Sequence, residues 1–127
     1  MNEIVLALPC GRRWHGVAQL VLAGLAARLD LTVEAIEDWQ LALGEILGRN
    51  EHEERVNVIF RNSPEQLEAR IGPVRDELVA ELERSEDGVG LRRVLSTLTD
   101  AVSVETSEDG RWIVLSKAIV SFRGGAG

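Results

Sequence analysis

The stretch VSVETSEDGRWIVLSKAI, residues 102–119, decides the class of fold. Its two halves, residues 102–106 and 111–119, are rich in β-branched and other apolar residues, which favour strands. Asp109-Gly110 stands between them, and an Asp-Gly pair flanked by strand residues is a strong signal for a β-hairpin. Strands joined this closely must be antiparallel, so the sequence predicts a sheet with at least one antiparallel pair.

Three further segments have strand character. Residues 56–60 (VNVIF) and 67–71 (LEARI) alternate along the chain, and a turn containing asparagine, serine and proline separates them. This pattern predicts a second hairpin with a longer loop. Residues 3–8 (EIVLAL) are mostly apolar and end at Pro9, so we expect a buried or edge strand there.

Four segments between these strands carry apolar residues at helical spacing. They are residues 12–29, the stretch after Thr32, residues 74–84 and residues 91–99. Thr32 is a good N-cap for the second helix because its hydroxyl can accept a hydrogen bond from the first turn. Pro73 suits the first position of the third helix, where no N–H is needed.

Two glycines within the second helix, Gly44 and Gly48, stand out. Each costs about 1 kcal/mol relative to alanine in a helix interior. We therefore expect a close approach of another helix, the sheet or a ligand at these positions.

The resulting order, β-α-α-β-β-α-α-β-β, defines the expected fold. Each predicted helix has one apolar face, so the helices should cover one side of a single sheet. We predict an α+β protein: a two-layer α/β sandwich with a mixed, mostly antiparallel sheet and helices on one face. Residues 1–122 form one domain in this prediction, and residues 123–127 form a flexible tail.

Composition limits the classes of function. The chain has 127 residues and a net charge of −7 at pH 7, which suits one core and repels a phosphate backbone. We expect no direct nucleic-acid contact and a partner protein with a basic or mixed surface. No apolar run reaches the roughly 20 residues that cross a bilayer, and the single cysteine, Cys10, excludes an internal disulfide. A cytoplasmic protein without a membrane partner fits these features.

A Gly-Val-Gly turn at residues 88–90 leads directly into the predicted helix at 91–99. Such a turn can cradle a phosphate with its backbone N–H groups. It can equally begin a helix for steric reasons alone, because glycine accepts backbone angles that other residues avoid. The turn by itself leaves both interpretations open.

Longer motifs, together with the element order, resemble a known family. They are IEDWQLALGEIL (36–47), RIGPV (70–74), LERSEDGVGL (82–91) and LTDAVSVET (98–106). The first three resemble the Asn-box helix, the first glycine turn, and the lid end with the second glycine box of the anti-sigma factor serine/threonine kinases. That family belongs to the histidine-kinase-like ATPase (GHKL, Bergerat fold) superfamily. The resemblance covers nearly the whole chain and implies that fold.

The resemblance also implies roles for individual residues. Glu45 matches the general base of the family, and Arg84 matches a lid arginine that faces the terminal phosphate of ATP. Gly72, Gly88 and Gly90 match glycines of the nucleotide pocket.

Other positions depart from the family pattern. Arg49 stands where the family has its Mg²⁺-binding asparagine, and Asn50 comes one residue later, about 100° further around the helix. Arg70 replaces an aspartate that reads adenine, and a guanidinium has only donors. Val74 replaces the second glycine of that turn. Phosphoryl transfer would thereby lose its main means of neutralising charge, the metal ion.

The resemblance and these departures predict a regulatory protein-binding module with a degenerate ATP pocket, acting in transcription or stress signalling. Its implied partner is a sigma factor or an anti-sigma antagonist. No cofactor or metal site is expected, and ATP and Mg²⁺ would bind only if the pocket still functions. Two alternatives stay open: an active serine/threonine kinase that uses Mg·ATP through Asn50, and a structural partner that dimerises through its sheet. A homodimer is compatible with each of them.

Simpler interpretations stand beside these roles. An i,i+4 ion pair between Glu45 and Arg49 is favoured over a free catalytic base. Arg49 and Arg70 are expected either to point into the former nucleotide pocket or to be exposed. Cys10 is interpreted as a small buried residue rather than a nucleophile, and His52 as a solvated surface residue.

Overall fold

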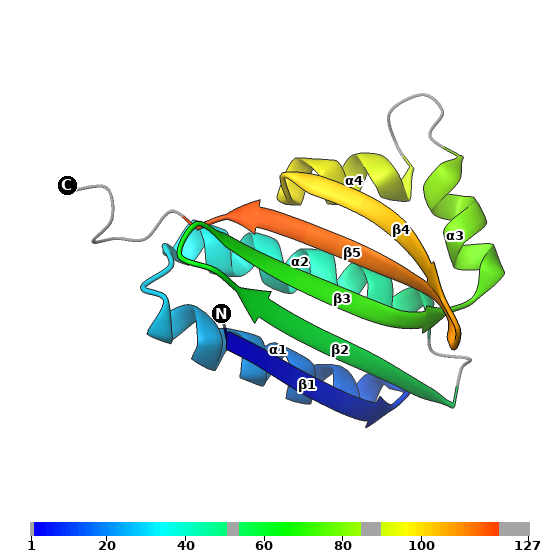
Figure 1. The fold of residues 1–127 in the computed structure, drawn as a ribbon, viewed down its shortest axis with the longest axis horizontal. Coiled ribbons are helices and arrows are strands. Elements are labelled where there is room, and N and C mark those ends of the chain that lie inside the picture. Colours follow the sequence, from blue (N-terminus) through cyan, green and yellow to red (C-terminus); the bar gives the residue numbers. More distant parts are fainter. Residues whose placement is uncertain (1, 51–53, 85–89, 120–127) are drawn as a thin grey trace.

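The computed structural model describes residues 2–50, 54–84 and 90–119. This part of the chain forms one five-stranded sheet with the strand order β1-β2-β3-β5-β4 (Figure 1). The strands are β1 (Asn2–Pro9), β2 (Arg55–Asn62), β3 (Gln66–Val74), β4 (Ala101–Ser107) and β5 (Gly110–Ala118). The helices are α1 (Arg12–Arg28), α2 (Val33–Arg49), α3 (Asp76–Glu83) and α4 (Leu91–Leu98).

The sheet and the helices form two layers, with α1, α2 and α4 behind the sheet in the view of Figure 1. Side chains from both layers share one hydrophobic core, in which Trp39 of α2 and Phe60 of β2 are each 1% exposed. Burial between a sheet face and amphipathic helices is the main stabilising contribution in such a sandwich. The predicted α+β class and the two-layer architecture are confirmed.

The prediction of a mixed sheet is wrong for the described residues, because every pair of neighbouring strands is antiparallel. The reason lies in the connections. Helices α1 and α2 run there and back between β1 and β2, so the chain enters β2 at the end where it left β1 (Figure 1). A connection of two helices thus gives an antiparallel pair, whereas a single crossover helix gives a parallel one.

Both predicted hairpins are confirmed. Strands β2 and β3 pair along most of their length, and Ser107 of β4 pairs with Gly110 of β5. Gly110 has a φ of +129°, in the region that favours glycine, and a Cβ there would lie 2.9 Å from the Cβ of Pro73. The turn therefore needs glycine both for its backbone angle and for the space beside β3.

The third helix begins later than predicted. Pro73 is a residue of β3, and α3 begins at Asp76 with Arg75 as its N-cap. Val74 is buried and still pairs with Arg111 of β5 after a register shift in the strand. Pairing and burial in the sheet outweigh the local preference of proline for a helix start, and a strand accepts proline at such an irregularity.

Helix α2 is capped as predicted: the Thr32 hydroxyl accepts a hydrogen bond from Ala35 N at 3.1 Å. Gly44 marks a close contact between α1 and α2, because a Cβ there would lie 3.3 Å from Nε2 of Gln19. At Gly48 a Cβ would meet nothing within 4 Å. The expectation of a close approach is therefore confirmed at Gly44 and wrong at Gly48.

Helix α1 is apolar around most of its surface and exposes part of it. The middle of its outer face consists of Val17, Leu20, Gly24 and Ala27, with the exposed Arg13 and Arg28 at the two ends, and Leu20 is 74% exposed. An exposed apolar helix face beside an edge strand, β1, is the kind of surface that proteins use for association. None of the helices in the described residues has the length and apolarity that crossing a membrane requires.

Candidate functional site

Arg49, the last residue of α2, connects this helix with α3. Its Nε donates a hydrogen bond to Glu81 Oε2 at 2.9 Å, and its Nη1 donates to the carboxylate of Glu45. The same Nη1 also donates to the backbone carbonyl of Glu45 at 3.1 Å. The predicted i,i+4 ion pair between Glu45 and Arg49 is confirmed, and Glu81 adds a second carboxylate to it.

The electrostatics of this group hold the guanidinium in its charged form. Burial would lower the pKa of Arg49, but the hydrogen bonds from its guanidinium to Glu81 and Glu45 outweigh this effect, so the pKa is raised. The three side chains are each about one third exposed, so solvent screens the pairs and each contributes at most about 1 kcal/mol. The Glu45 carboxylate is therefore already bound to a cation within its own chain.

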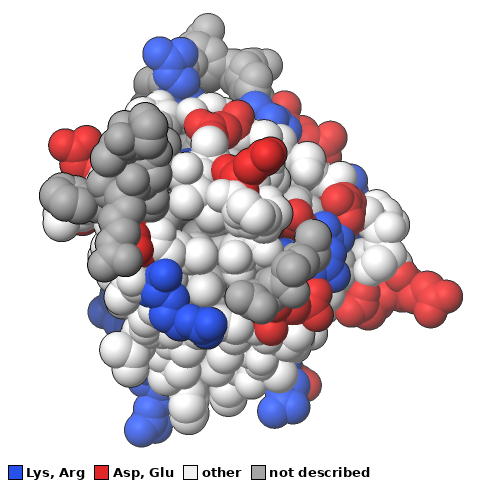
Figure 2. All heavy atoms as spheres, turned by 60° about the vertical axis from the view of Figure 1, so that its left-hand side comes forward, with Lys and Arg blue, Asp and Glu red and all other residues white. Residues whose placement is uncertain are grey.

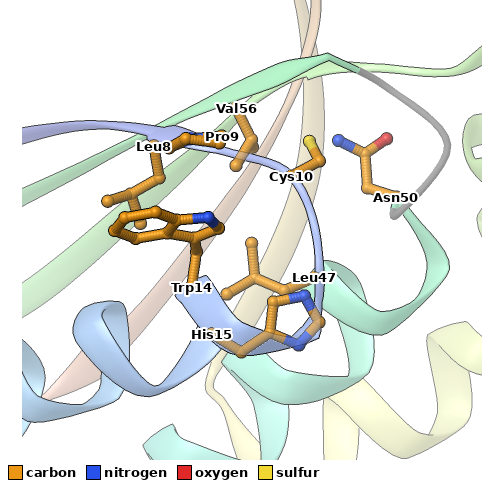
Figure 3. Close-up of a pocket in the computed structure, with 8 residues that line it drawn as sticks. All are labelled: Leu8, Pro9, Cys10, Trp14, His15, Leu47, Asn50 and Val56. Atoms are coloured by element: carbon orange, nitrogen blue, oxygen red, sulfur yellow. The ribbon is translucent and has the colours of Figure 1, made fainter.

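Asn50 points to a different part of the molecule from Arg49. It is the C-cap of α2 and is 1% exposed. Its Oδ1 accepts a hydrogen bond from the backbone N of Arg75 at 3.4 Å, while Nη2 of Arg75 donates to the Arg49 carbonyl at 3.0 Å. Figure 3 shows the carboxamide of Asn50 directed toward Cys10, at the end of β1. Two adjacent residues thus face different neighbours, as their 100° separation on a helix requires.

Arg70 lies on the open face of the sheet, away from the helices. Its neighbours Ala69 and Ile71 are buried in the core, and alternate residues of a strand face opposite sides. Arg70 Nη2 donates to the Glu105 carboxylate on β4, and its Nη1 donates to Glu68 Oε1 at 2.9 Å. These two hydrogen bonds raise the pKa of Arg70, and the bond from Arg70 lowers the pKa of Glu105.

Arg49 and Arg70 therefore do not share a pocket in this structure. Arg49 lies on the helical side of the sheet, and Arg70 lies on the open side. We expected both arginines either to point into one pocket or to be exposed. Neither expectation describes them fully, because each arginine is partly exposed and ion-paired.

The glycines of the family motifs have local structural explanations. A Cβ on Gly72 would lie 2.6 Å from Trp112 Cδ2, so this glycine makes room for the indole that packs across β3. Gly90 is the N-cap of α4, and a Cβ there would lie 3.4 Å from the carbonyl oxygen of Arg84. Arg84 is the exposed C-cap of α3. Gly88 lies outside the described residues, so the interpretation of this turn as a phosphate loop stays a prediction.

A groove of about 300 Å³ runs between α2 and α4 beside Glu45. Its lining residues are Leu41, Glu45, Arg93, Val94, Thr97 and Leu98. Half of these residues, Leu41, Val94 and Leu98, are aliphatic, and Glu45 is the one carboxylate among them. The groove therefore combines an aliphatic surface with polar groups from Glu45, Arg93 and Thr97.

In this arrangement Glu45 does not offer a free carboxylate to a metal ion. The carboxylate of Glu45 is bound by Arg49, and the guanidinium supplies donors only. Mg²⁺ prefers oxygen ligands in octahedral geometry, and a fixed cation at this place repels a second one. Within the described ranges, no group of three or more His, Cys, Asp or Glu residues could hold a metal ion.

A second, smaller pocket lies where β1, α1 and α2 meet (Figure 3). Its lining residues are Leu8, Pro9, Cys10, Trp14, His15, Leu47, Asn50 and Val56. Cys10 is half-buried rather than buried, so the prediction for this residue is corrected. Two features of the sequence bear on this pocket. Cys10 stands between β1 and α1, and Asn50 ends α2. His52 lies outside the described residues.

The sequence matches no known protein-family model, and no curated protein matches it.

Proposed function

We propose that this chain is a regulatory protein-binding module that resembles an anti-sigma factor and has lost the chemistry of the ATP pocket. In this proposal it acts in the cytoplasm and binds a sigma factor or an anti-sigma antagonist. The finer fold assignment, to the histidine-kinase-like ATPases, belongs to the same proposal. It has the support of the order β-α-α-β-β-α-α-β-β and of the motifs that accompany it.

The observation that carries the proposal is the position of Arg49 between Glu45 and Glu81. In the family pattern, a metal ligand stands at position 49 and a free base at position 45. Here position 49 holds an arginine, and its guanidinium binds the carboxylate of Glu45. An enzyme that depends on Mg²⁺ to neutralise phosphate charge cannot use this arrangement without rebuilding it.

The surface supports a protein partner. Acidic and basic side chains are interspersed in the view of Figure 2, with much uncharged surface between them. A surface of this kind suits a protein with mixed charge better than a polyanion, which the net charge of −7 also disfavours. The outer face of α1 adds exposed apolar area, with Val17 37% and Leu20 74% exposed.

The alternative, an active kinase, would need Asn50 to replace the missing metal ligand. Asn50 instead accepts a hydrogen bond from Arg75 N and is directed toward Cys10. Its side chain would have to leave a buried site to reach the groove beside Glu45. The geometry therefore gives more support to the binding module than to the kinase.

Calorimetry with Mg·ATP tests the proposal directly. We expect the wild-type chain to show no binding tighter than a Kd of about 100 µM. The matched variant is Arg49→Asn, which restores the family residue at this position and frees the Glu45 carboxylate. Tight binding by the wild-type chain, or transfer of labelled phosphate from ATP to a serine of a partner protein, would contradict the proposal.

The Arg49→Asn variant separates two explanations for the absence of binding. If it gains affinity for Mg·ATP, the arginine alone blocks an otherwise intact pocket. If it gains none, other departures such as Arg70 and Val74 also contribute. A control variant, Arg61→Asn, removes a cation from the open face of the sheet and should change nothing.

A further inference from the structure

The outer face of α1 carries an exposed seam with the spacing of a helix–helix contact. The seam consists of Val17, Leu20, Gly24 and Ala27, all of them exposed. They follow one another at steps of three, four and three residues, which is the pattern by which one helix packs along another. No Asp, Glu, Lys or Arg occurs between Arg13 and Arg28. An uncharged, exposed seam of this kind is typical of an association surface.

Two glycines of α1 have no explanation in the packing of the described residues. Gly16 and Gly24 are exposed, and a Cβ at either position would meet nothing within 4 Å. Glycine inside a helix is less favourable than alanine, so it is retained where something comes close to the backbone. At Gly44 that neighbour is Gln19 of the same chain. At Gly16 and Gly24 the space is open to another molecule.

The seam is complementary in size to the same seam of a second copy. Two α1 helices that lie antiparallel about a two-fold axis at the level of position 22 place Leu20 of each copy opposite Gly24 of the other. Val17 then lies opposite Ala27. Each large side chain of the seam thus meets a small residue, and this alternation lets two helices interdigitate at close range.

The charges at the two ends of the seam fit the same arrangement. Arg28 of one copy lies opposite Gly16 of the other, which leaves room for the long arginine side chain. Arg13 comes near Asp30 of the second copy, just beyond the C-terminal end of its α1. A parallel pair would instead set each arginine beside its own counterpart and leave Gly24 facing Gly24. Charge and size therefore both favour the antiparallel pair.

The edge strand β1 adds to this contact surface. It is the first strand of the sheet, so one of its edges has no neighbouring strand, and it packs against α1. The chain reverses direction between β1 and α1 (Figure 1). The two-fold axis that makes the helices antiparallel therefore makes the two β1 strands antiparallel as well. Unpaired strand edges bind other strands through their N–H and C=O groups, so the edges extend the contact beyond the helix pair.

We propose that the chain forms a homodimer in which the outer face of α1 packs antiparallel on the same face of a second copy. Leu20 of each copy lies over Gly24 of the other. The occupant of this face is a second copy because one and the same helix supplies a small residue for each large one and a carboxylate for Arg13. This dimer is independent of the proposed function, since it requires nothing of the affinity for Mg·ATP.

Substitution of Gly24 tests the close approach, with the dimer Kd of the intact chain measured by sedimentation velocity. We expect Gly24→Ala to raise the Kd at least about tenfold, because the new methyl group meets Leu20 twice, once in each copy. The same change should raise the denaturation midpoint at a concentration where the chain is monomeric, since alanine favours the helix and its Cβ has open space. The matched control, Gly48→Ala on α2, should raise the midpoint and leave the Kd unchanged.

Disulfide cross-linking tests the antiparallel register in a Cys10→Ser background, which removes the thiol of the natural chain. An equal mixture of the Leu20→Cys and Gly24→Cys variants should cross-link at least about tenfold faster than either variant alone, because the two positions lie opposite one another. A mixture that reacts no faster than the single variants would overturn the antiparallel arrangement. A wild-type chain that stays monomeric up to about 1 mM, or an unchanged Kd for Gly24→Ala, would overturn the proposed dimer.

Discussion

At the scale of single residues, positions 49 and 50 show how one step along a helix changes the groups that a side chain contacts. Arg49 pairs with carboxylates of α2 and α3, and Asn50 caps the helix and faces Cys10. If asparagine stood at position 49 and arginine at position 50, a neutral amide would lie next to Glu45. An asparagine near this helix end is therefore not enough to indicate a metal ligand. The direction in which its side chain points from the helix decides which groups it can contact.

Gly72 offers a test of packing at the same scale. We expect Gly72→Ala to lower the free energy of unfolding by about 1–3 kcal/mol, because the new Cβ would lie 2.6 Å from the Trp112 indole. Denaturant unfolding measures this change. Gly48→Ala is the matched control: it should stabilise the chain by about 0.5–1 kcal/mol, since it adds a helix former where no atom lies within 4 Å. A neutral Gly72→Ala would show that the indole can move aside.

The ion pair between Arg70 and Glu105 predicts a pH dependence. The pKa of Glu105 is lowered in the folded chain, mainly by its hydrogen bond with Arg70. The charged carboxylate therefore stabilises the fold above its ordinary pKa of 4.5, and this stabilisation is lost as the pH falls through the lowered value. We expect Glu105→Gln to be about 0.5 kcal/mol less stable than wild type at pH 7, since the pair is solvent-screened.

The difference between wild type and Glu105→Gln should disappear in acid, as measured by unfolding at a series of pH values. The control is the same comparison in an Arg70→Gln background, where no difference is expected at any pH. A difference that persists in acid would mean that Glu105 acts by packing rather than by charge.

At the scale of elements, α2 carries groups at its C-terminal end that connect the rest of the fold. Arg49 reaches α3, Asn50 reaches the N–H of Arg75, and Arg75 returns to the Arg49 carbonyl. These contacts join two helices that lie far apart in the sequence. They hold α3 against the end of α2.

A double-mutant cycle on Arg49→Gln and Glu81→Gln measures this connection. We expect a coupling free energy of about 0.5–1 kcal/mol at low salt, because both side chains are about one third exposed and partly screened. The coupling should fall as salt is added. The cycle Arg61→Gln with Glu3→Gln, a more exposed pair between β1 and β2, is the control and should couple less. Absence of coupling at low salt would mean that this ion pair adds no measurable free energy to the stability of the fold.

At the scale of the whole molecule, the distribution of apolar surface is uneven. The helical layer buries its core side efficiently, yet α1 presents Leu20 and its neighbours to solvent beside the edge strand β1. Association through this surface would cover both the apolar face and the unpaired strand edge. This is the surface at which we expect a homodimer or a partner protein to bind.

Substitution of Leu20 tests that expectation. We expect the wild-type chain to form a concentration-dependent dimer in sedimentation velocity, and Leu20→Glu to weaken it at least about tenfold. Leu20 is 74% exposed, so the folding stability should change by no more than about 0.5 kcal/mol. Leu41→Glu, at a 58% exposed position on α2, is the control and should leave the dimer intact. A wild-type chain that is monomeric at all concentrations would rule out self-association.

The sequence by itself determined the elements and their order. Local signals sufficed there: Thr32 as a cap, Asp109-Gly110 as a turn, and apolar spacing in the helices, because each depends on neighbours within a few residues. The ion pair of Glu45 and Arg49 was predictable for the same reason, since residues four apart on a helix are neighbours.

Only the tertiary structure decided which side chains meet across elements. Glu81 joins Arg49, Arg70 faces the open side of the sheet, and Cys10 and Asn50 share a pocket, although 40 positions separate the last two in the numbering. Sheet pairing also kept Pro73 and Val74 in β3 against the local helix signal. Such contacts depend on how two layers pack and on strand register, and neither is encoded in a short stretch of chain.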